Sequence, residues 1–298
     1  MDATFRAGDE TLAQLVSARR EEVVQLQTDE SDRLQNMEKR GQRQIKALRK
    51  NLSEDISSML TGLDSASRES AEASTSNIDS VKARLIESAP STKNETAVHP
   101  GLAGGRLIAP SSLGWFQPYY GTLHWSDGTV IWQGYNPGNI TVWDSASGSG
   151  PGWFGTGAAS ATIFMDWWFY YTAPQDQNYN NTIYVPFHGF DLLHADDGFW
   201  TSYEASASIN LAATGYQYNY KPTATTNVFS MDSQNINVND RFDGWRTMYY
   251  SDLLGADTAY LLVSASFYVY ARGDGSYAEL NFADGTANYL GVPWVYVD

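Results

Sequence analysis

The segment that decides the fold runs from Leu12 to Leu85 and begins LAQLVSARREEVVQLQTDESDRLQNMEKRGQRQIKALRKNLSEDISSML (residues 12–60). Its large aliphatic residues recur in steps of three, four and four, which makes an eleven-residue repeat. Of the 21 positions on this repeat, 15 carry Leu, Ile, Val or Met. Eleven residues over three turns is about 3.67 residues per turn, so these positions form one nearly straight apolar stripe along a helix.

A single helix of this length buries nothing by itself, because it would extend roughly 110 Å. Its stripe needs partner helices, either from other copies of the chain or from a fold-back of the same chain. We expect an unbroken helix. The alternative is a hairpin near residues 62–77, where Gly62 and Asn77 bracket a serine-rich stretch.

The stripe therefore predicts a coiled-coil stalk over residues 1–86 that holds several copies of the chain together, with a parallel trimer favoured. The predicted oligomerisation residues are the aliphatic members of the stripe. They are Leu12, Leu15, Val23, Leu26, Leu34, Met37, Ile45, Leu48, Leu52, Ile56, Met59, Leu63, Ile78, Val81 and Leu85.

Three residues without an apolar side chain occupy the third position of the first three repeats. They are Arg19, Glu30 and Gly41. A charge that faces inward in a coiled coil fixes the register or the number of helices, at a cost in stability. We expect these positions to help specify how the stalk assembles.

The sequence changes character after residue 86. Residues 87–112 contain three prolines and several glycines, which predicts a linker or collar. Beyond it the hydrophobic period falls to two, as in residues 161–171, 203–213 and 259–269. The sequence thus predicts an all-β antiparallel sandwich, jelly-roll-like, over residues 113–298, and an α+β chain whose stalk and head are separate modules.

One predicted strand, at residues 161–171, carries large side chains on both faces. Opposite its core face lie Phe164, Trp168 and Tyr170, with Asp166 among them. A strand that is apolar on both faces contacts protein on both sides. We expect one of these contacts to be with a neighbouring subunit.

The acidic residues concentrate in the predicted head. Residues 1–99 carry 14 basic and 17 acidic residues (net −3), and residues 100–298 carry 5 and 17 (net −12). So acidic a head repels phosphate backbones, which argues against nucleic acid as a partner. There is no cysteine, which excludes disulfides and thiolate metal sites, and no motif implies a cofactor.

The N-terminus lacks the basic leader and apolar core of a Sec signal, and no apolar run is long enough to span a bilayer. We therefore expect synthesis in the cytoplasm, followed by assembly into a particle or export by another route.

Aromatic residues in turn-rich segments give the best signal for binding. Trp and Tyr beside Asn, Asp and Gln offer an apolar face and a hydrogen-bonding tip, which suits a glycan or a protein receptor. The alternative is that these rings fill the sandwich or a subunit seam. The candidate binding residues are Trp115, Tyr119, Tyr120, Trp153, Phe154, Trp200, Tyr218 and Tyr220.

Three other kinds of chemistry are weaker alternatives. A metal could be held by His188, His194, Asp196 and Asp197, or calcium by Asp232, Asp240 and Asp243. A glycosidase needs a facing pair of carboxylates, for which Glu204 and Glu279 are the only glutamates of the head. An amphipathic helix with this period could also lie on lipid, which would make the chain a pore-forming toxin.

The expected architecture is similar to that of fibrous adhesins and phage fibres, in which a helical stalk carries β-sandwich heads. The sequence therefore predicts a fibre-like homo-oligomer without enzymatic activity. Its heads would bind a glycan or a protein receptor, and avidity would strengthen weak contacts.

Overall fold

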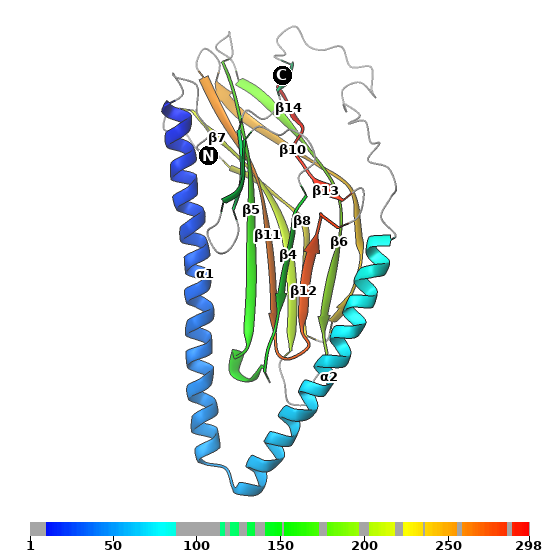
Figure 1. Ribbon diagram of the computed structural model, residues 1–298. Helices are drawn as coiled ribbons and strands as arrows, with labels where there is room; N and C mark the ends of the chain where they lie inside the picture. The colour runs from blue at the N-terminus through cyan, green and yellow to red at the C-terminus, as the bar shows by residue number, and fades with distance from the viewer. Residues whose placement is uncertain are drawn as a thin grey trace.

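A computed structural model describes residues 10–87, 114–116, 120–124, 130–134, 141–150, 152–172, 178–196, 203–217, 223–234, 236–254, 258–284 and 288–297. Within these residues, two long helices precede fourteen strands (Figure 1). This order confirms the prediction of an N-terminal helical part followed by antiparallel sheets. The predicted linker lies, beyond Glu87, outside the described residues.

The helical segment consists of α1 (Glu10–Lys50) and α2 (Glu54–Glu87). The prediction of a single unbroken helix is therefore wrong. The alternative hairpin near residues 62–77 is also wrong, because those residues lie inside α2. The chain turns instead around Leu52, and we call residues 48–59 the elbow.

Local chemistry places the break at this point. Basic side chains occupy the last turn of α1 and acidic side chains the first turn of α2, and both suit the helix dipole. Asn51 Nδ2 donates a hydrogen bond to the carbonyl of Ala47 (3.0 Å). The carbonyl of Ser53 accepts the first backbone hydrogen bond of α2 from Ser57 (3.0 Å), as an N-cap residue does.

The described strands form two antiparallel sheets. Sheet B has the order β3-β2-β5-β11-β7-β8, and sheet A has the order β1-β14-β6-β12-β4, with β9, β10 and β13 also paired to β6. The strands of sheet B are β2 (Tyr120–His124), β3 (Val130–Gly134), β5 (Ala158–Thr172), β7 (Glu204–Tyr216), β8 (Thr223–Ser233) and β11 (Thr258–Arg272). Those of sheet A are β1 (Gly114–Phe116), β4 (Trp143–Ser147), β6 (Asn178–Ala195), β9 (Ile236–Val238), β10 (Arg241–Leu254), β12 (Tyr277–Asn281), β13 (Tyr289–Leu290) and β14 (Trp294–Val297). A jelly-roll connectivity stays a prediction.

The core lies between the two sheets and is built from alternate residues of each strand. On β5 these residues include Met165 and Trp167, and on β11 they include Val263 and Phe267, all of them almost fully buried. The period of two in the sequence therefore identifies the core faces of these long strands correctly. The sequence does not predict β10, because Asp243 and Gly244 interrupt its apolar alternation.

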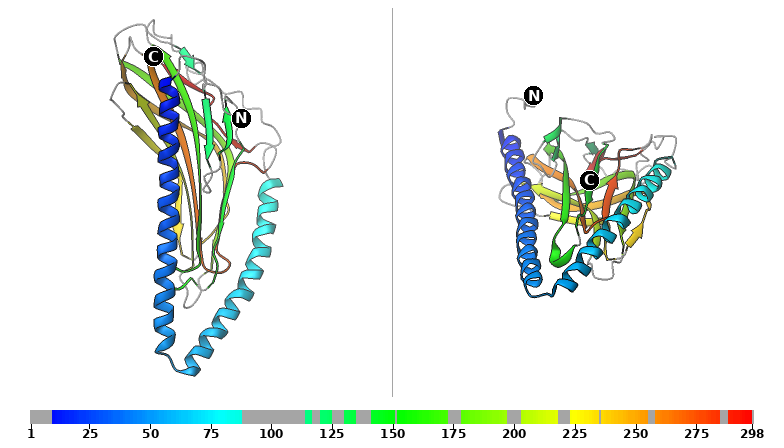
Figure 2. Two further views of the ribbon diagram at one scale, coloured as in Figure 1. Left: turned by 60° about the vertical axis from the view of Figure 1, so that its left-hand side comes forward. Right: turned by 60° about the horizontal axis from the view of Figure 1, so that its bottom comes forward.

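The helices lie along the outer faces of the sandwich and form a V around it (Figures 1 and 2). Helix α1 packs on sheet B and helix α2 on sheet A. The described helices are thus not a stalk that projects away from the head. No described helix is both long enough and apolar enough to cross a membrane.

The eleven-residue repeat marks the side of each helix that faces the sandwich. Leu12, Val23, Gly41 and Ile45 of α1 are buried, and so are Ser74, Ile78 and Val81 of α2; all seven are positions of the repeat. A stripe with this period runs nearly straight along a helix, so it can follow a long sheet. The chain's own sandwich covers these positions, where the sequence predicts partner helices.

The polar positions of the repeat make the most specific contacts of α1. Arg19 forms a bidentate ion pair with the fully buried Asp166 (Nε to Oδ2 3.2 Å, Nη2 to Oδ1 3.4 Å). Burial lowers the pKa of Arg19, but Asp166 outweighs this and holds the pKa above its ordinary value. The strand β5 thus contacts protein on both faces, as predicted, but α1 of the same chain covers the second face.

Glu30 is a second polar anchor of α1. Its carboxylate accepts hydrogen bonds from Ser160 Oγ (3.0 Å) and Tyr268 OH (3.0 Å), and it pairs with Arg33 (2.6 Å). Burial raises the pKa of Glu30, but the hydrogen bonds from these three residues hold it below its usual range. The ionised carboxylate of Glu30 therefore stabilises the docked position of α1.

Helix α2 is held on sheet A by a smaller set of contacts. Ile78 and Val81 pack against Leu192. Lys82 Nζ lies 2.8 Å from Oε1 of Glu279, whose side chain is fully buried. Each helix is thus fixed by one basic side chain that pairs with a buried carboxylate on the sheet beneath it.

Candidate binding groove

The candidate site lies where α1 meets the turn between β4 and β5, at residues 148–157. This turn contains the short 3-10 helix η1 (Trp153–Gly155). Backbone hydrogen bonds tie it to its surroundings, from Ser149 N to the carbonyl of Gly157 (2.8 Å) and from Gly148 N to that of Ser276 (2.9 Å). The glycine-rich segment, which in the sequence resembles a plain flexible loop, therefore forms a defined support.

Glycines let α1 approach this turn closely. A Cβ atom on Gly41 would lie 2.5 Å from Thr156 Cγ2, and one on Gly155 would lie 2.7 Å from Met37 Cγ. Glu38 Oε2 also accepts a hydrogen bond from the backbone N–H of Gly157 (2.8 Å). Gly41, the small residue of the third repeat, thus allows α1 to contact the turn.

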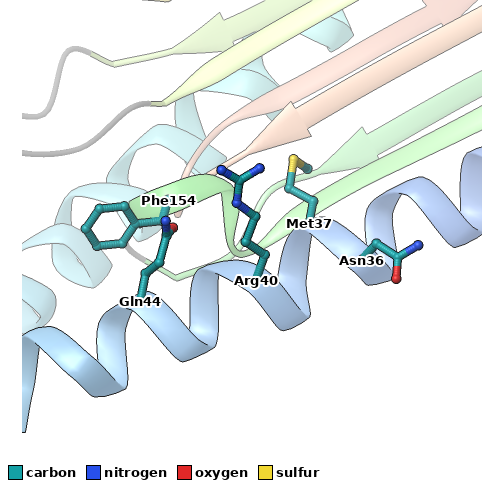
Figure 3. A pocket seen from close by; sticks show the side chains of 5 residues that line it. All are labelled: Asn36, Met37, Arg40, Gln44 and Phe154. Carbon is teal, nitrogen blue, oxygen red and sulfur yellow. The ribbon is translucent and has the colours of Figure 1, made fainter.

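A groove of ≈ 410 Å³ opens beside this contact. Figure 3 shows its lining side chains in a row along α1, with the ring of Phe154 at the end nearest Gln44. The lining residues are Asn36, Met37, Arg40, Gln44 and Phe154. The groove therefore combines one aromatic ring and one thioether with a guanidinium and two amides.

Phe154 is held in an unusual backbone conformation. Its φ of 53° and ψ of 27° lie in the left-handed region, and it is the only described residue other than glycine with a positive φ. Its side chain is nevertheless 49% exposed, whereas Trp153 beside it is buried. A bulky residue in this region is strained by about 1–3 kcal/mol, and such strain clusters at functional sites.

Arg40 is available to a ligand. Within the described part of the chain its guanidinium forms no ion pair or hydrogen bond, and the residue is exposed. An unpaired guanidinium offers up to five donors in a planar fork, which suits hydroxyl and carboxylate oxygens. The amides of Gln44 and Asn36, at opposite ends of the row of lining side chains (Figure 3), add both donors and acceptors.

The structure brings only part of the predicted aromatic set to this site. Phe154 lines the groove, whereas its neighbour Trp153 is buried and does not line it. Trp115 lies in β1 and Tyr120 in β2, away from the 148–157 turn in sequence and sheet position. The other four predicted residues, Tyr119, Trp200, Tyr218 and Tyr220, lie outside the described residues.

Sequence reasoning misses every residue that α1 contributes to the groove except Met37, which it assigns to oligomerisation. Asn36, Arg40 and Gln44 resemble ordinary solvated helix positions. It also misses two exposed aromatics of sheet A, Trp245 on β10 (59% exposed) and Trp143 on β4. Only the fold shows that a helix lies against the 148–157 turn.

The alternative metal ligands His188 and His194 each pair with an aspartate, and Asp197 lies outside the described residues. His194 Nε2 lies 3.5 Å from Asp196 Oδ1. His188 Nδ1 lies 2.8 Å from Asp243 Oδ1, and Arg241 pairs with the same carboxylate (3.2 Å). Burial raises the pKa of Asp243, but hydrogen bonds from Arg241 and His188 bring it below its ordinary value. Among the described residues, no three His, Asp or Glu side chains gather as a metal site would require.

The two glutamates of the head lie on different sheets. Glu204 on β7 pairs with Arg272 (2.6 Å). Glu279 on β12 pairs with Lys82 and accepts hydrogen bonds from Asn281 Nδ2 (2.6 Å) and Tyr277 OH. They do not face one another as the two carboxylates of a glycosidase do.

Two aspartates carry raised pKa values but face the interior. Asp144 and Asp191 both pair in register with Leu280, a core residue, so the pleat directs all three side chains into the sandwich. Burial raises the pKa of each to about 7. Both carboxyl groups thus lie buried between the two sheets.

No protein-family model matches the chain, and no curated protein matches it. Among solved structures, the carbohydrate-binding module TmCBM61 in complex with β-1,4-galactotriose is 7% identical, with a TM-score of 0.22 over 55% of this chain and 73% of the module. A bacteriophage CBA120 tailspike protein 4 domain is 7% identical (TM-score 0.16; 58% and 19% covered), and an Arthrobacter globiformis isomalto-dextranase complexed with panose is 11% identical (0.16; 61% and 30%). Similarities this low assign neither fold nor function to the chain.

Proposed function

We propose that this chain is a binding protein without enzymatic activity, and that it recognises a glycan in the groove between α1 and the 148–157 turn. The supporting observation is Phe154, a half-exposed ring in a strained conformation beside a guanidinium and two amides. An aromatic ring packs on the apolar face of a sugar. The amide and guanidinium groups hydrogen bond to its hydroxyls, which gives orientation and specificity.

The test is a glycan panel applied to the full chain, followed by calorimetric titration of the glycans that bind. Phe154→Gly removes the ring while keeping a residue that tolerates positive φ. We expect it to weaken binding about 10-fold or more, since stacking and hot-spot contacts are worth at least 1–2 kcal/mol. Arg40→Gln should weaken binding of the same glycans.

Two controls locate the site. Tyr170→Ala removes an aromatic side chain that is 39% exposed but does not line the groove, and it should leave binding unchanged. Trp245→Ala removes the rival exposed aromatic. If Trp245→Ala abolished binding and Phe154→Gly did not, the groove would not be the glycan site.

The absence of enzymatic activity is part of the proposal. It is supported by the separation of Glu204 and Glu279 on different sheets and by their basic partners. The fibre-like assembly and the parallel trimer remain predictions. The five stripe residues that the sandwich buries, Leu12, Val23, Ile45, Ile78 and Val81, could join a coiled coil only if the helices left it. The membrane-active alternative would require the same release.

A further inference from the structure

The eleven-residue stripe is mostly covered where the helices lie on the sheets, with Leu26 (46% exposed) as an exception, and its exposed residues cluster at the elbow. Figure 1 shows that the elbow extends beyond the ends of the strands, so no sheet lies beneath it. There the stripe residues Leu48, Ile56 and Met59 are 38%, 44% and 59% exposed. By the period of the repeat, these residues lie on the same side of their helices as the sheet-facing ones. The sequence thus keeps apolar residues in register where the single chain does not bury them.

The two arms that meet at the elbow carry opposite charges. Residues 39–50 of α1, the basic arm, contain six basic residues and no acidic one, a net of +6. Residues 54–72 of α2, the acidic arm, contain five acidic residues and one basic one, a net of −4. Within one chain the two helices diverge from the elbow, so the distance between the two arms grows away from it (Figure 2).

We infer that the elbow is the surface through which two copies of this chain associate, with the basic arm of each copy against the acidic arm of the other. A two-fold dimer would cover the exposed apolar residues and pair the oppositely charged arms at the same time, because each copy offers the same apolar residues and both charged arms. The stripes then cover Leu48, Ile56 and Met59, and the acidic arm of each copy offsets most of the charge of the other's basic arm (−4 against +6). This inference does not rest on the glycan proposal, although the basic arm includes Arg40 and Gln44, which line the groove.

Charge favours a second copy over a lipid surface as the occupant. The elbow carries Arg49 and Lys50 as well as Glu54 and Asp55, so an anionic bilayer that received the apolar residues would meet two carboxylates along with the two cations. A second copy instead offers partners of both signs. The same two carboxylates would attract the basic arm of a second copy. A regular stripe is also the geometry that helices use to pack on helices.

The first experiment measures the mass of the full chain by analytical ultracentrifugation over a concentration series. We expect a dimer that dissociates on dilution and in high salt, since charged arms are screened. Ile56→Gln with Met59→Gln should weaken dimerisation about 10-fold or more, because it removes the exposed apolar surface. Val24→Gln is the matched control, since Val24 is an exposed aliphatic residue of α1 outside the elbow.

The second experiment exchanges charges between the arms. Lys46→Glu with Arg49→Glu reverses two charges of the basic arm and lowers its net charge from +6 to +2, and Glu54→Lys with Asp55→Lys reverses two charges of the acidic arm and raises its net charge from −4 to 0. Each variant alone should be mostly monomeric, and an equimolar mixture should recover dimers. Circular dichroism on each variant separates loss of association from loss of the helices.

Three results would overturn the inference. They are a monomer at every concentration, an oligomer that the elbow substitutions leave intact, and charge variants that fail to recover on mixing. Lipid would be the partner of the elbow if the chain alone stayed monomeric but sedimented with anionic vesicles. The Ile56→Gln/Met59→Gln variant should then no longer sediment with them. Glycan binding by monomeric Ile56→Gln/Met59→Gln should be unaffected, because neither residue lines the groove, so the two proposals fail separately.

Discussion

The stripe residues that lie on the sandwich and those at the elbow follow the same eleven-residue repeat. The sandwich covers most of the first group, and most of the second is exposed to solvent. On the sandwich, the repeat positions whose burial is described are buried or half-buried, except Leu26 (46% exposed), and the polar ones among them find specific partners, such as Asp166 for Arg19. At the elbow, repeat positions such as Met59 are exposed. The comparison teaches that hydrophobic periodicity shows which side of a helix is covered, but not what covers it.

The largest effect should come from breaking the ion pair beneath α1. Arg19→Met leaves the carboxylate of Asp166 buried without its cationic partner, which typically costs about 3–5 kcal/mol of unfolding free energy. Chemical denaturation measures this loss. The double variant Arg19→Met/Asp166→Asn removes the charge as well and should recover part of the stability. Equal stability of wild type and Arg19→Met would contradict the docked position of α1.

Two glycines sharpen the comparison, because replacement by alanine should lower the unfolding free energy at Gly41 and raise it at Gly62. Gly41→Ala places a methyl group against Thr156 and the carbonyl of Phe154, so we expect a loss of about 1–3 kcal/mol and a weaker glycan site. Gly62→Ala meets nothing within 4 Å and should add roughly 0.5–1 kcal/mol, as alanine does in an exposed helix. Thermal and chemical unfolding report both values. The same sign for both would show that α1 does not touch the turn.

Acid should loosen the docked part of α1. The pKa of Glu30 is lower in the folded protein than in the unfolded chain, so its contribution to stability is present above the unfolded value, about 4.5, and is lost as pH falls through the folded value. Glu30→Gln should therefore reduce stability near neutral pH and have little further effect in strong acid. Because the carboxylate is partly exposed, the difference should be about 1 kcal/mol or less. A variant that followed the wild-type pH profile would contradict this role.

The smallest effect is expected at the elbow. Ile56→Gln/Met59→Gln should change the unfolding free energy of the monomer by no more than about 0.5 kcal/mol, because these side chains are exposed in the single chain. Denaturation at concentrations below dimerisation measures this. A loss of several kcal/mol would mean that the elbow is buried within one chain.

The sequence predicts element types well and their partners poorly. The repeat identifies the covered side of both helices, and the alternation in residues such as Met165 and Trp167 identifies the core face of β5. The break at the elbow is missed, although Asn51 and Ser53 are suitable capping residues, because the apolar repeat continues through Leu52. Local periodicity contains no information about which distant surface a helix will meet.

The groove could be predicted only in part, for the same reason. An aromatic residue in a glycine-rich turn is visible in the sequence, and Phe154 is such a residue. Its left-handed conformation is not visible, because it depends on the backbone bonds of the whole turn. The contribution of Arg40 and Gln44 depends on α1 lying against that turn, a contact between segments more than one hundred residues apart.

Small-angle X-ray scattering on dilute monomer tests the central claim, that the helices lie on their own sandwich, most directly. Helix α1 has 41 residues, or about 60 Å at 1.5 Å per residue, so the docked V should give a compact particle with a maximum dimension below about 90 Å. A helical segment that projects as a stalk would add roughly 110 Å to the sandwich. A maximum dimension above about 130 Å for the monomer would contradict the account.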